Sequence, residues 1–218
     1  MDSVPCVPDA PPRGARSSAE SDGPHPAQVS YLAPTVNRSV KILIAGHFGV
    51  GKTTLVNSVS EIEPLRTEEP ITQASTGVDD LAGLADKHET TVALDFGRLT
   101  LNERLVLYLF GTPGQQRFWP LWDDLAHGAL GALVLVDTRR LEASDAVLGF
   151  IEERGLPFAV AVNEFTGARR FPAEEIRQAL DLAERTPLVL CDARDRAASL
   201  DALITLVHYL ARRQETRP

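Results

Sequence analysis

Apolar runs alternate with helical patterns from residue 39 onward, and this alternation predicts the fold class. Several runs lack polar alternation, which is typical of strands buried on both faces of a parallel sheet. The six predicted strands are 40–45, 92–96, 105–110, 132–136, 157–162 and 188–191. The predicted helices lie near 52–60, 141–153, 173–184 and 199–212. Repeated strand–helix units predict an α/β fold in three layers, with a mostly parallel six-stranded sheet and helices on both of its faces. In such a fold the ligand is expected at the carboxyl ends of the strands.

The last predicted helix carries apolar residues at helical spacing behind Ser199, a residue type that caps helix N-termini. We expect this stripe to pack in the core rather than to bind a partner. Its residues are Leu200, Leu203, Ile204, Val207 and Leu210.

Composition changes near residue 38. Residues 1–38 mix proline with Ser, Asp, Ala and Gly and show no apolar periodicity, which predicts a disordered tail; a proline-rich docking segment is the alternative. The chain has 218 residues, 44% of them hydrophobic, enough for one core. We therefore expect one domain over 39–214 and a flexible end at 215–218.

The formal net charge of −8 argues against a nucleic-acid-binding surface. No apolar stretch approaches the ~18 residues of a membrane span, and the N-terminus resembles neither a signal peptide nor a lipidation site. Cys6 and Cys191 lie in very different settings and are poor disulfide partners. These features indicate a cytoplasmic protein without direct membrane insertion.

Residues 46–54, Gly-His-Phe-Gly-Val-Gly-Lys-Thr-Thr, fit the P-loop pattern between a predicted strand and a predicted helix. Glycines let successive N–H groups point at a phosphate, aided by the helix dipole. Lys52 is expected to neutralise the β- and γ-phosphates, and the Thr53 hydroxyl to bind Mg²⁺. This P-loop predicts nucleoside triphosphate binding. The residues predicted to hold the nucleotide here are Gly46, Gly49, Val50, Gly51, Lys52, Thr53 and Thr54.

A second informative stretch, residues 110–122, reads Phe-Gly-Thr-Pro-Gly-Gln-Gln-Arg-Phe-Trp-Pro-Leu-Trp. It resembles the Asp-x-x-Gly-Gln motif of Ras-like small GTPases, which have a P-loop G domain, and its tail resembles the Arf branch. The resemblance implies that the Gly114 N–H meets the γ-phosphate. It also implies that Gln115, or alternatively Gln116, orients the attacking water as the catalytic residue.

The aspartate of that motif is replaced by Gly111, as it is lost in MglA-like bacterial GTPases. Segments 48–54, 60–67 and 134–140 resemble the D-component GTPases of actinobacterial conservons still more closely. This resemblance implies a roadblock-type regulator and a membrane-bound sensor kinase as partners, with peripheral membrane association through protein contacts.

A Ras-like switch also needs a threonine over Mg²⁺ and the γ-phosphate. Thr91 opens a predicted strand about 20 residues before Gly111, close to the Arf spacing, and is our candidate metal ligand. Thr90 and Thr76 are the alternatives. The acidic segment 61–90 is interpreted as either a mobile switch or a solvated insertion.

The base-recognition motif departs from the Asn-Lys-x-Asp of guanine-specific proteins. Asn163 matches it and is expected to contact the base or brace the P-loop, whereas Glu164 and Thr166 replace the lysine and the carboxylate. A hydroxyl lacks the bidentate anionic contact, so discrimination against adenine should weaken. The Ala193 N–H is expected to meet the guanine carbonyl, and GTP and GDP stay the favoured ligands by resemblance.

Unaided hydrolysis is expected to be slow, because Phe48 stands where fast Ras-like enzymes tolerate only small residues, and no arginine precedes Thr91. Arg117 is the nearest arginine that could assist hydrolysis, and a surface salt bridge is its alternative role.

Among the nearby aromatic residues, one of Trp119 and Trp122 is expected to dock a partner and the other to pin a short helix to the sheet. The sequence thus predicts a GTP-binding switch with partner-dependent hydrolysis. The alternatives are a non-hydrolysing nucleotide-binding scaffold, an ATP-preferring P-loop protein and a small-molecule kinase.

Overall fold

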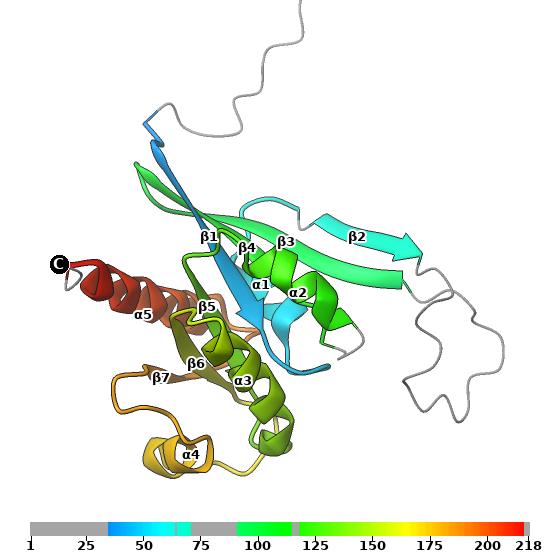
Figure 1. Cartoon of the computed structure of the whole chain (residues 1–218), viewed down its shortest axis with the longest axis vertical. Coiled ribbons are helices and arrows are strands. Elements are labelled where there is room, and N and C mark those ends of the chain that lie inside the picture. Colours follow the sequence, from blue (N-terminus) through cyan, green and yellow to red (C-terminus); the bar gives the residue numbers. More distant parts are fainter. Residues whose placement is uncertain (1–34, 64, 71–90, 115–117, 216–218) are drawn as a thin grey trace, which may run out of the picture. The chain divides into compact units, whose positions relative to one another are not determined.

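The computed structural model describes residues 35–63, 65–70, 91–114 and 118–215 (Figure 1), with the backbone alone at 65–70 and 91–93. The predicted tail lies almost wholly outside these residues, and so does most of the predicted C-terminal end. Among the helices of the described ranges, none is both long and apolar enough to cross a membrane.

Within the described ranges, seven strands form one sheet in the order β2-β3-β4-β1-β5-β6-β7. All neighbours from β4 to β7 pair in parallel, whereas β2–β3 and β3–β4 are antiparallel. The strands are β1 (Arg38–Ala45), β2 (Leu65–Pro70), β3 (Thr91–Asn102), β4 (Leu105–Gly111), β5 (Gly131–Val136), β6 (Phe158–Asn163) and β7 (Leu188–Cys191). The predicted α/β fold with a mostly parallel sheet is confirmed.

The predicted number of six strands is wrong, because β2 adds a seventh at the sheet edge. Its sequence, Leu-Arg-Thr-Glu-Glu-Pro, has no apolar run, so hydrophobic periodicity does not reveal it. Antiparallel pairing with β3 across six residue pairs makes it a strand. The other six strands correspond to the predicted ones.

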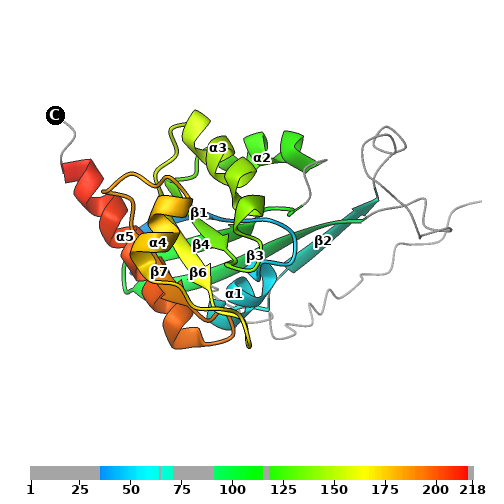
Figure 2. The ribbon, with the colours of Figure 1, turned by 90° about the horizontal axis from the view of Figure 1, so that it is seen from below.

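Helices cover both faces of the sheet (Figure 2), with α2 and α3 on one side and α1 on the other. One core cluster joins residues of α1 and α5 to one face, and a second joins α2, α3 and α4 to the opposite face. The helices are α1 (Lys52–Val59), α2 (Trp119–Ala126), the 3-10 helix η3 (Leu141–Ser144), α3 (Asp145–Glu153), α4 (Ala173–Ala179) and α5 (Arg196–Glu215).

Three details of the helix prediction are wrong. Helix α5 begins at Arg196, so Ser199 lies inside it, fully buried, and the Asp195 carboxylate accepts the Ala197 N–H at 2.9 Å in the capping position instead. Ile204 is 39% exposed, while Leu206 takes a core position. Helix α4 also ends five residues before the predicted end at 184.

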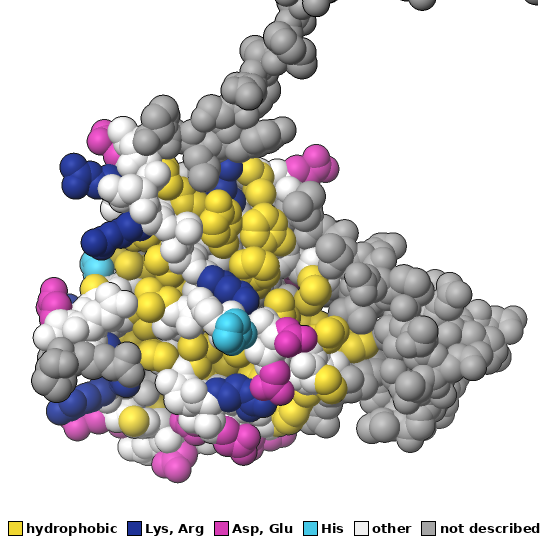
Figure 3. Space-filling view, turned by 45° about the horizontal axis from the view of Figure 1, so that its top comes forward, with side chains coloured by type: hydrophobic (Ala, Val, Ile, Leu, Met, Phe, Trp, Pro, Cys, Tyr) yellow, Lys and Arg dark blue, Asp and Glu magenta, His cyan; other side chains and the backbone are white. Residues whose placement is uncertain are grey.

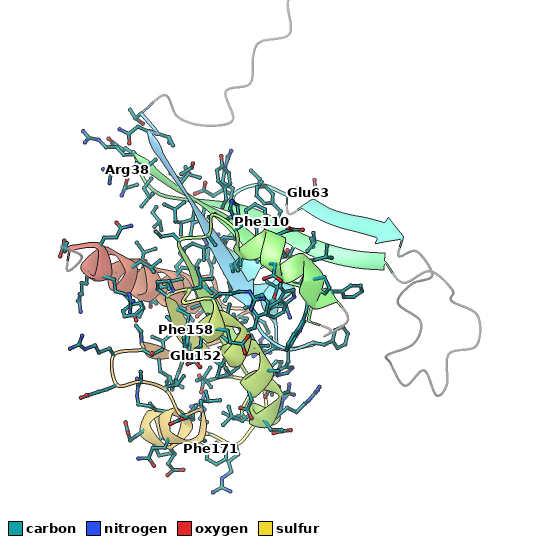
Figure 4. All side chains as sticks on the ribbon, in the orientation of Figure 1. Arg38, Glu63, Phe110, Glu152, Phe158 and Phe171 are labelled. Carbon is teal, nitrogen blue, oxygen red and sulfur yellow. The ribbon has the colours of Figure 1, made fainter. Side chains whose placement is uncertain are left out.

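Helix α2 is held to the sheet by Trp122, which is fully buried and whose Nε1 donates to the Pro113 carbonyl at 3.0 Å. Trp122 packs edge-on against Phe150 of α3. Figure 4 labels Phe110 on β4, which packs against the same core cluster. Trp122 is therefore the tryptophan that pins the helix, and Trp119, half-buried, is the one with a partly open face.

Candidate functional site

The P-loop connects β1 to α1 through backbone that only glycine adopts easily. Gly51, the N-cap of α1, has a φ of 108°, and a Cβ there would lie 2.4 Å from Asn163 Nδ2. Gly46 is equally restricted, since its Cβ would meet the Leu135 carbonyl oxygen at 2.6 Å. The loop therefore curls tightly around the N-terminus of α1, whose first N–H groups have no partner within the helix.

Lys52 places a buried cation inside this loop. Its Nζ donates to the carbonyls of Gly46 at 2.7 Å and His47 at 2.9 Å, which satisfies two of its three protons. Burial lowers the pKa of Lys52 from 10.5 to about 8, and the charge of Asp95 acts in the opposite direction. An anionic phosphate beside this ammonium would compensate its desolvation.

The remaining P-loop positions differ in exposure. Val50 is fully buried in the core, and Gly49 has open space where a Cβ would be, at a φ of 78°. Thr54 is exposed, and so is the Phe48 side chain, at 65%.

Asn163, the last residue of β6, braces the P-loop through hydrogen bonds of its side-chain amide. Its Nδ2 donates to the Val50 carbonyl at 2.8 Å, and its Oδ1 accepts the Ala193 N–H at 3.0 Å. The Ala193 N–H, predicted to meet the guanine carbonyl, is thus already bonded to a side chain. Of the two roles expected for Asn163, contact with the base and bracing of the P-loop, these hydrogen bonds correspond to the second.

The loop after β4 lies directly against the P-loop. A Cβ on Gly114 would lie 2.5 Å from Phe48 Cα and 2.9 Å from Lys52 Nζ. The bond from Trp122 to Pro113 and a bond of 3.0 Å from the Thr112 N–H to the Ile44 carbonyl fix the loop on both sides. Two predicted phosphate-binding segments, distant in sequence, therefore meet at the lysine ammonium.

Asp95 of β3 is a site residue that the sequence analysis missed. The Thr53 hydroxyl donates to Asp95 Oδ2 at 2.5 Å, and the carboxyl-bearing side chain is only 7% exposed. Asp95 faces Gly111 in the β3–β4 register. An acidic residue in an otherwise apolar strand is the available signal, because aspartate is depleted in strands.

His47 and Asp137 form a second buried polar group near the P-loop. His47 Nδ1 donates to the Phe48 carbonyl at 2.8 Å, and burial lowers the pKa of the ring. Burial would raise the pKa of Asp137, but its hydrogen bonds with Arg139 hold that pKa below the ordinary value. Arg139 also stacks on the Phe165 ring at 3.6 Å from the centroid. A buried, neutral His47 fits its predicted role as a lining residue.

The side chains at the predicted base-recognition motif form ion pairs and hydrogen bonds with neighbouring side chains. Glu164 pairs with Arg170 at 2.9 Å. Arg194 pairs with Asp192 at 2.7 Å and donates to the Thr166 hydroxyl at 3.3 Å. A cation therefore stands beside the hydroxyl that replaces the expected carboxylate.

Several predicted residues lie outside the described part of the chain. These are Gln115, Gln116 and Arg117, as well as the alternatives Thr76 and Thr90. Thr91 begins β3, as predicted, but its side chain is not described. Within the described ranges, no group of three or more His, Cys, Asp or Glu side chains could hold a metal ion.

Solved structures share this fold. The G domain of the T. maritima FeoB iron transporter matches with a TM-score of 0.54 and 20% identity, covering 79% of this chain and 99% of that one. The FeoB G-domain of Methanococcus jannaschii matches with a TM-score of 0.55 and 15% identity, covering 80% and 99%. These likenesses show that the chain has the fold of a P-loop GTPase G domain.

Curated sequences give two further relatives. The uncharacterized protein MJ1339 of Methanocaldococcus jannaschii is 26% identical over 127 residues, which is 57% of this chain and 70% of that protein. The Ras-related protein RABC2a of Arabidopsis thaliana is 34% identical over 107 residues, 48% of this chain and 41% of that protein. The chain thus spans less than half the length of the plant relative.

A family model described as "conserved hypothetical ATP binding protein" matches residues 44–213, which contain the P-loop, the loop after β4 and the Asn163 brace. The chain therefore belongs to this family of conserved hypothetical ATP binding proteins.

Proposed function

We propose that this protein is a nucleotide-dependent switch that binds GTP and GDP with Mg²⁺ and hydrolyses GTP slowly until a partner acts. The observation that carries the proposal is the buried Lys52 ammonium, held by two P-loop carbonyls and adjoined by Gly114. This arrangement concentrates positive charge and N–H groups where a β- and γ-phosphate would lie. Similarity to FeoB G domains and to a Ras-related protein supports the choice of GTP.

The site residues fit a bound Mg²⁺, because the Thr53 hydroxyl lies in the first turn of α1 next to a buried carboxylate. When bound, Mg²⁺ would neutralise the phosphate oxygens and fix their orientation. Thr53 would hold it from the P-loop and Thr91 from the start of β3. Gln115, or alternatively Gln116, would orient the attacking water, and Gly114 would sense the γ-phosphate through its N–H.

The partner-dependent part of the proposal rests on two exposed hydrophobic side chains, one in the P-loop and one on α2. Phe48 is 65% exposed and Leu121 of α2 is 37% exposed. Apart from these two residues, Figure 3 shows that one face of the described residues displays further hydrophobic side chains with Lys and Arg side chains beside them. The resemblance to conservon GTPases points to a roadblock-type regulator and a membrane sensor kinase as partners, which would bring the protein to the membrane through protein contacts.

An ATP-binding protein is the second candidate, and two observations favour it. The family description names ATP. In addition, Arg194 beside Thr166 offers a donor where guanine needs an anionic acceptor. A non-hydrolysing scaffold is the third candidate, because Gly111 leaves β4 without its expected aspartate.

Removal of the Lys52 ammonium tests the proposed site. Lys52→Ala should weaken binding of a fluorescent GDP or GTP analogue about 100-fold, as expected for losing a charged contact worth ~3 kcal/mol. Lys41→Ala is the matched control, because Lys41 lies on β1 and donates to the His127 carbonyl at 2.9 Å. Unchanged affinity in Lys52→Ala, with the protein folded, would defeat the P-loop assignment.

Phosphate release distinguishes the switch from the scaffold. Single-turnover GTP hydrolysis should be slow, on the order of 10⁻⁴ s⁻¹ unaided, and should accelerate when a roadblock-type regulator is added. Gln115→Ala should abolish the acceleration. A protein that binds GTP but releases no phosphate under either condition would be the scaffold.

A further inference from the structure

The position that lacks its expected carboxylate has a carboxylate directly beside it. The resemblance to small GTPases places an aspartate at position 111, which is glycine here and ends β4. Asp95 of β3 pairs with Gly111 across the antiparallel β3–β4 ladder. Residues directly opposite each other in such a ladder present their side chains on the same face of the sheet.

The Asp95 side chain occupies the volume that a side chain at position 111 would enter. A Cβ built on Gly111 would lie 2.9 Å from Asp95 Cβ and 3.1 Å from Asp95 Oδ2. An aspartate at each position would force one of the two side chains to move. The glycine on β4 and the aspartate on β3 are therefore complementary.

Asp95 also contacts the P-loop side of the site. Its Oδ2 accepts the Thr53 hydroxyl at 2.5 Å. The side chain is only 7% exposed, and a buried carboxylate is costly unless a partner compensates it. A carboxylate and a hydroxyl are oxygen donors that Mg²⁺ accepts together with phosphate oxygens and water.

We propose that Asp95, together with Thr53, holds the Mg²⁺ of the bound nucleotide and so replaces the missing aspartate of β4 from the neighbouring strand. This inference rests on the proposed nucleotide-binding function and deepens it. It explains how Gly111 is compatible with metal-dependent nucleotide binding.

The first test measures the release rate of a fluorescent GDP analogue from the full chain over a range of free Mg²⁺ concentrations. Wild type should release the nucleotide more slowly as Mg²⁺ rises. Asp95→Asn, which keeps the shape and loses the charge, should need about 10- to 100-fold more Mg²⁺ for the same effect. Its affinity for the nucleotide in EDTA should not fall, because no phosphate contact is removed. Asp201→Asn on α5 is the exposed acidic control.

The second test moves the carboxylate back to β4. Gly111→Asp alone should destabilise the protein, since its side chain collides with Asp95. The double variant Asp95→Gly/Gly111→Asp frees that volume and should recover the Mg²⁺ dependence that Asp95→Gly loses. This variant also tests the role of Asp95 if Asp95→Asn fails to fold. Circular dichroism checks the folding of each variant.

The outcomes separate two kinds of failure. If wild type binds no nucleotide with or without Mg²⁺, the proposed function fails and this inference falls with it. If wild type shows Mg²⁺-dependent release and folded Asp95→Asn shows the same dependence, the nucleotide site stands and the role of Asp95 is refuted. A folded double variant that stays insensitive to Mg²⁺ would refute the claim that Asp95 on β3 takes the role of an aspartate at position 111 on β4.

Discussion

At the scale of single residues, the site depends on side chains that serve two backbone segments at once. Asn163 uses both ends of one amide, donating to Val50 and accepting from Ala193. It is only 5% exposed, so water cannot easily replace either bond. The shape of the P-loop is therefore coupled to the loop after β7 through a single side chain.

Asn163→Ala should lower the free energy of unfolding by about 2 kcal/mol or more, because it leaves the Val50 carbonyl and the Ala193 N–H buried without partners. Urea denaturation measures this. Gln178→Ala, an exposed position on α4, should change stability by less than about 0.5 kcal/mol. Equal stability of Asn163→Ala and wild type would show that the brace contributes little.

At the scale of elements, the carboxyl ends of β1, β4 and β6 bring the site together. The P-loop follows β1, the glycine loop follows β4, and Asn163 ends β6. β1 pairs in parallel with both β4 and β5, and β5 pairs in parallel with β6, so these carboxyl ends lie along the same side of the sheet. The loop after β4 is the element expected to respond to the γ-phosphate.

Gly114→Ala should reduce affinity for a non-hydrolysable GTP analogue about tenfold and leave GDP affinity nearly unchanged. The added Cβ would meet the Phe48 backbone at 2.5 Å and push the Gly114 N–H away from the γ-phosphate. Competition binding with the two nucleotides checks the ratio. Gly149→Ala on α3 is the glycine control, because the added Cβ would have only the backbone of its own helix within 4 Å. A parallel loss of GDP affinity would mean that Gly114 shapes the whole P-loop instead.

The sequence predicted the P-loop and not Asp95 for a physical reason. The P-loop residues, such as Gly51 and Lys52, lie in one short stretch of sequence, so their pattern can be recognised without knowing the fold. The role of Asp95 depends on which residue of β4 lies opposite, and a one-residue slip of register would turn the carboxylate to the other face. The edge strand β2 was missed because pairing with β3, rather than its own polar sequence, makes it a strand.

At the scale of the whole molecule, an acidic chain carries a local cationic site. The net charge is −8, yet the P-loop encloses Lys52, and Arg140 acts electrostatically on the adjacent His47. An anionic ligand would therefore be attracted by the local positive charge rather than by the overall charge of the protein. The match of residues 44–213 to one family contains the P-loop, the loop after β4 and Asn163.

The most direct test of the proposed guanine-nucleotide switch is a competition experiment on the purified protein. GTP, GDP, ATP and ADP would each displace a fluorescent guanine nucleotide, with and without Mg²⁺. We expect GTP and GDP to compete at clearly lower concentrations than the adenine nucleotides, and Mg²⁺ to strengthen their binding. Displacement by ATP or ADP at equal or lower concentrations would contradict a switch that prefers guanine nucleotides. It would instead support the hypothesis that Thr166 and Arg194 favour adenine nucleotides.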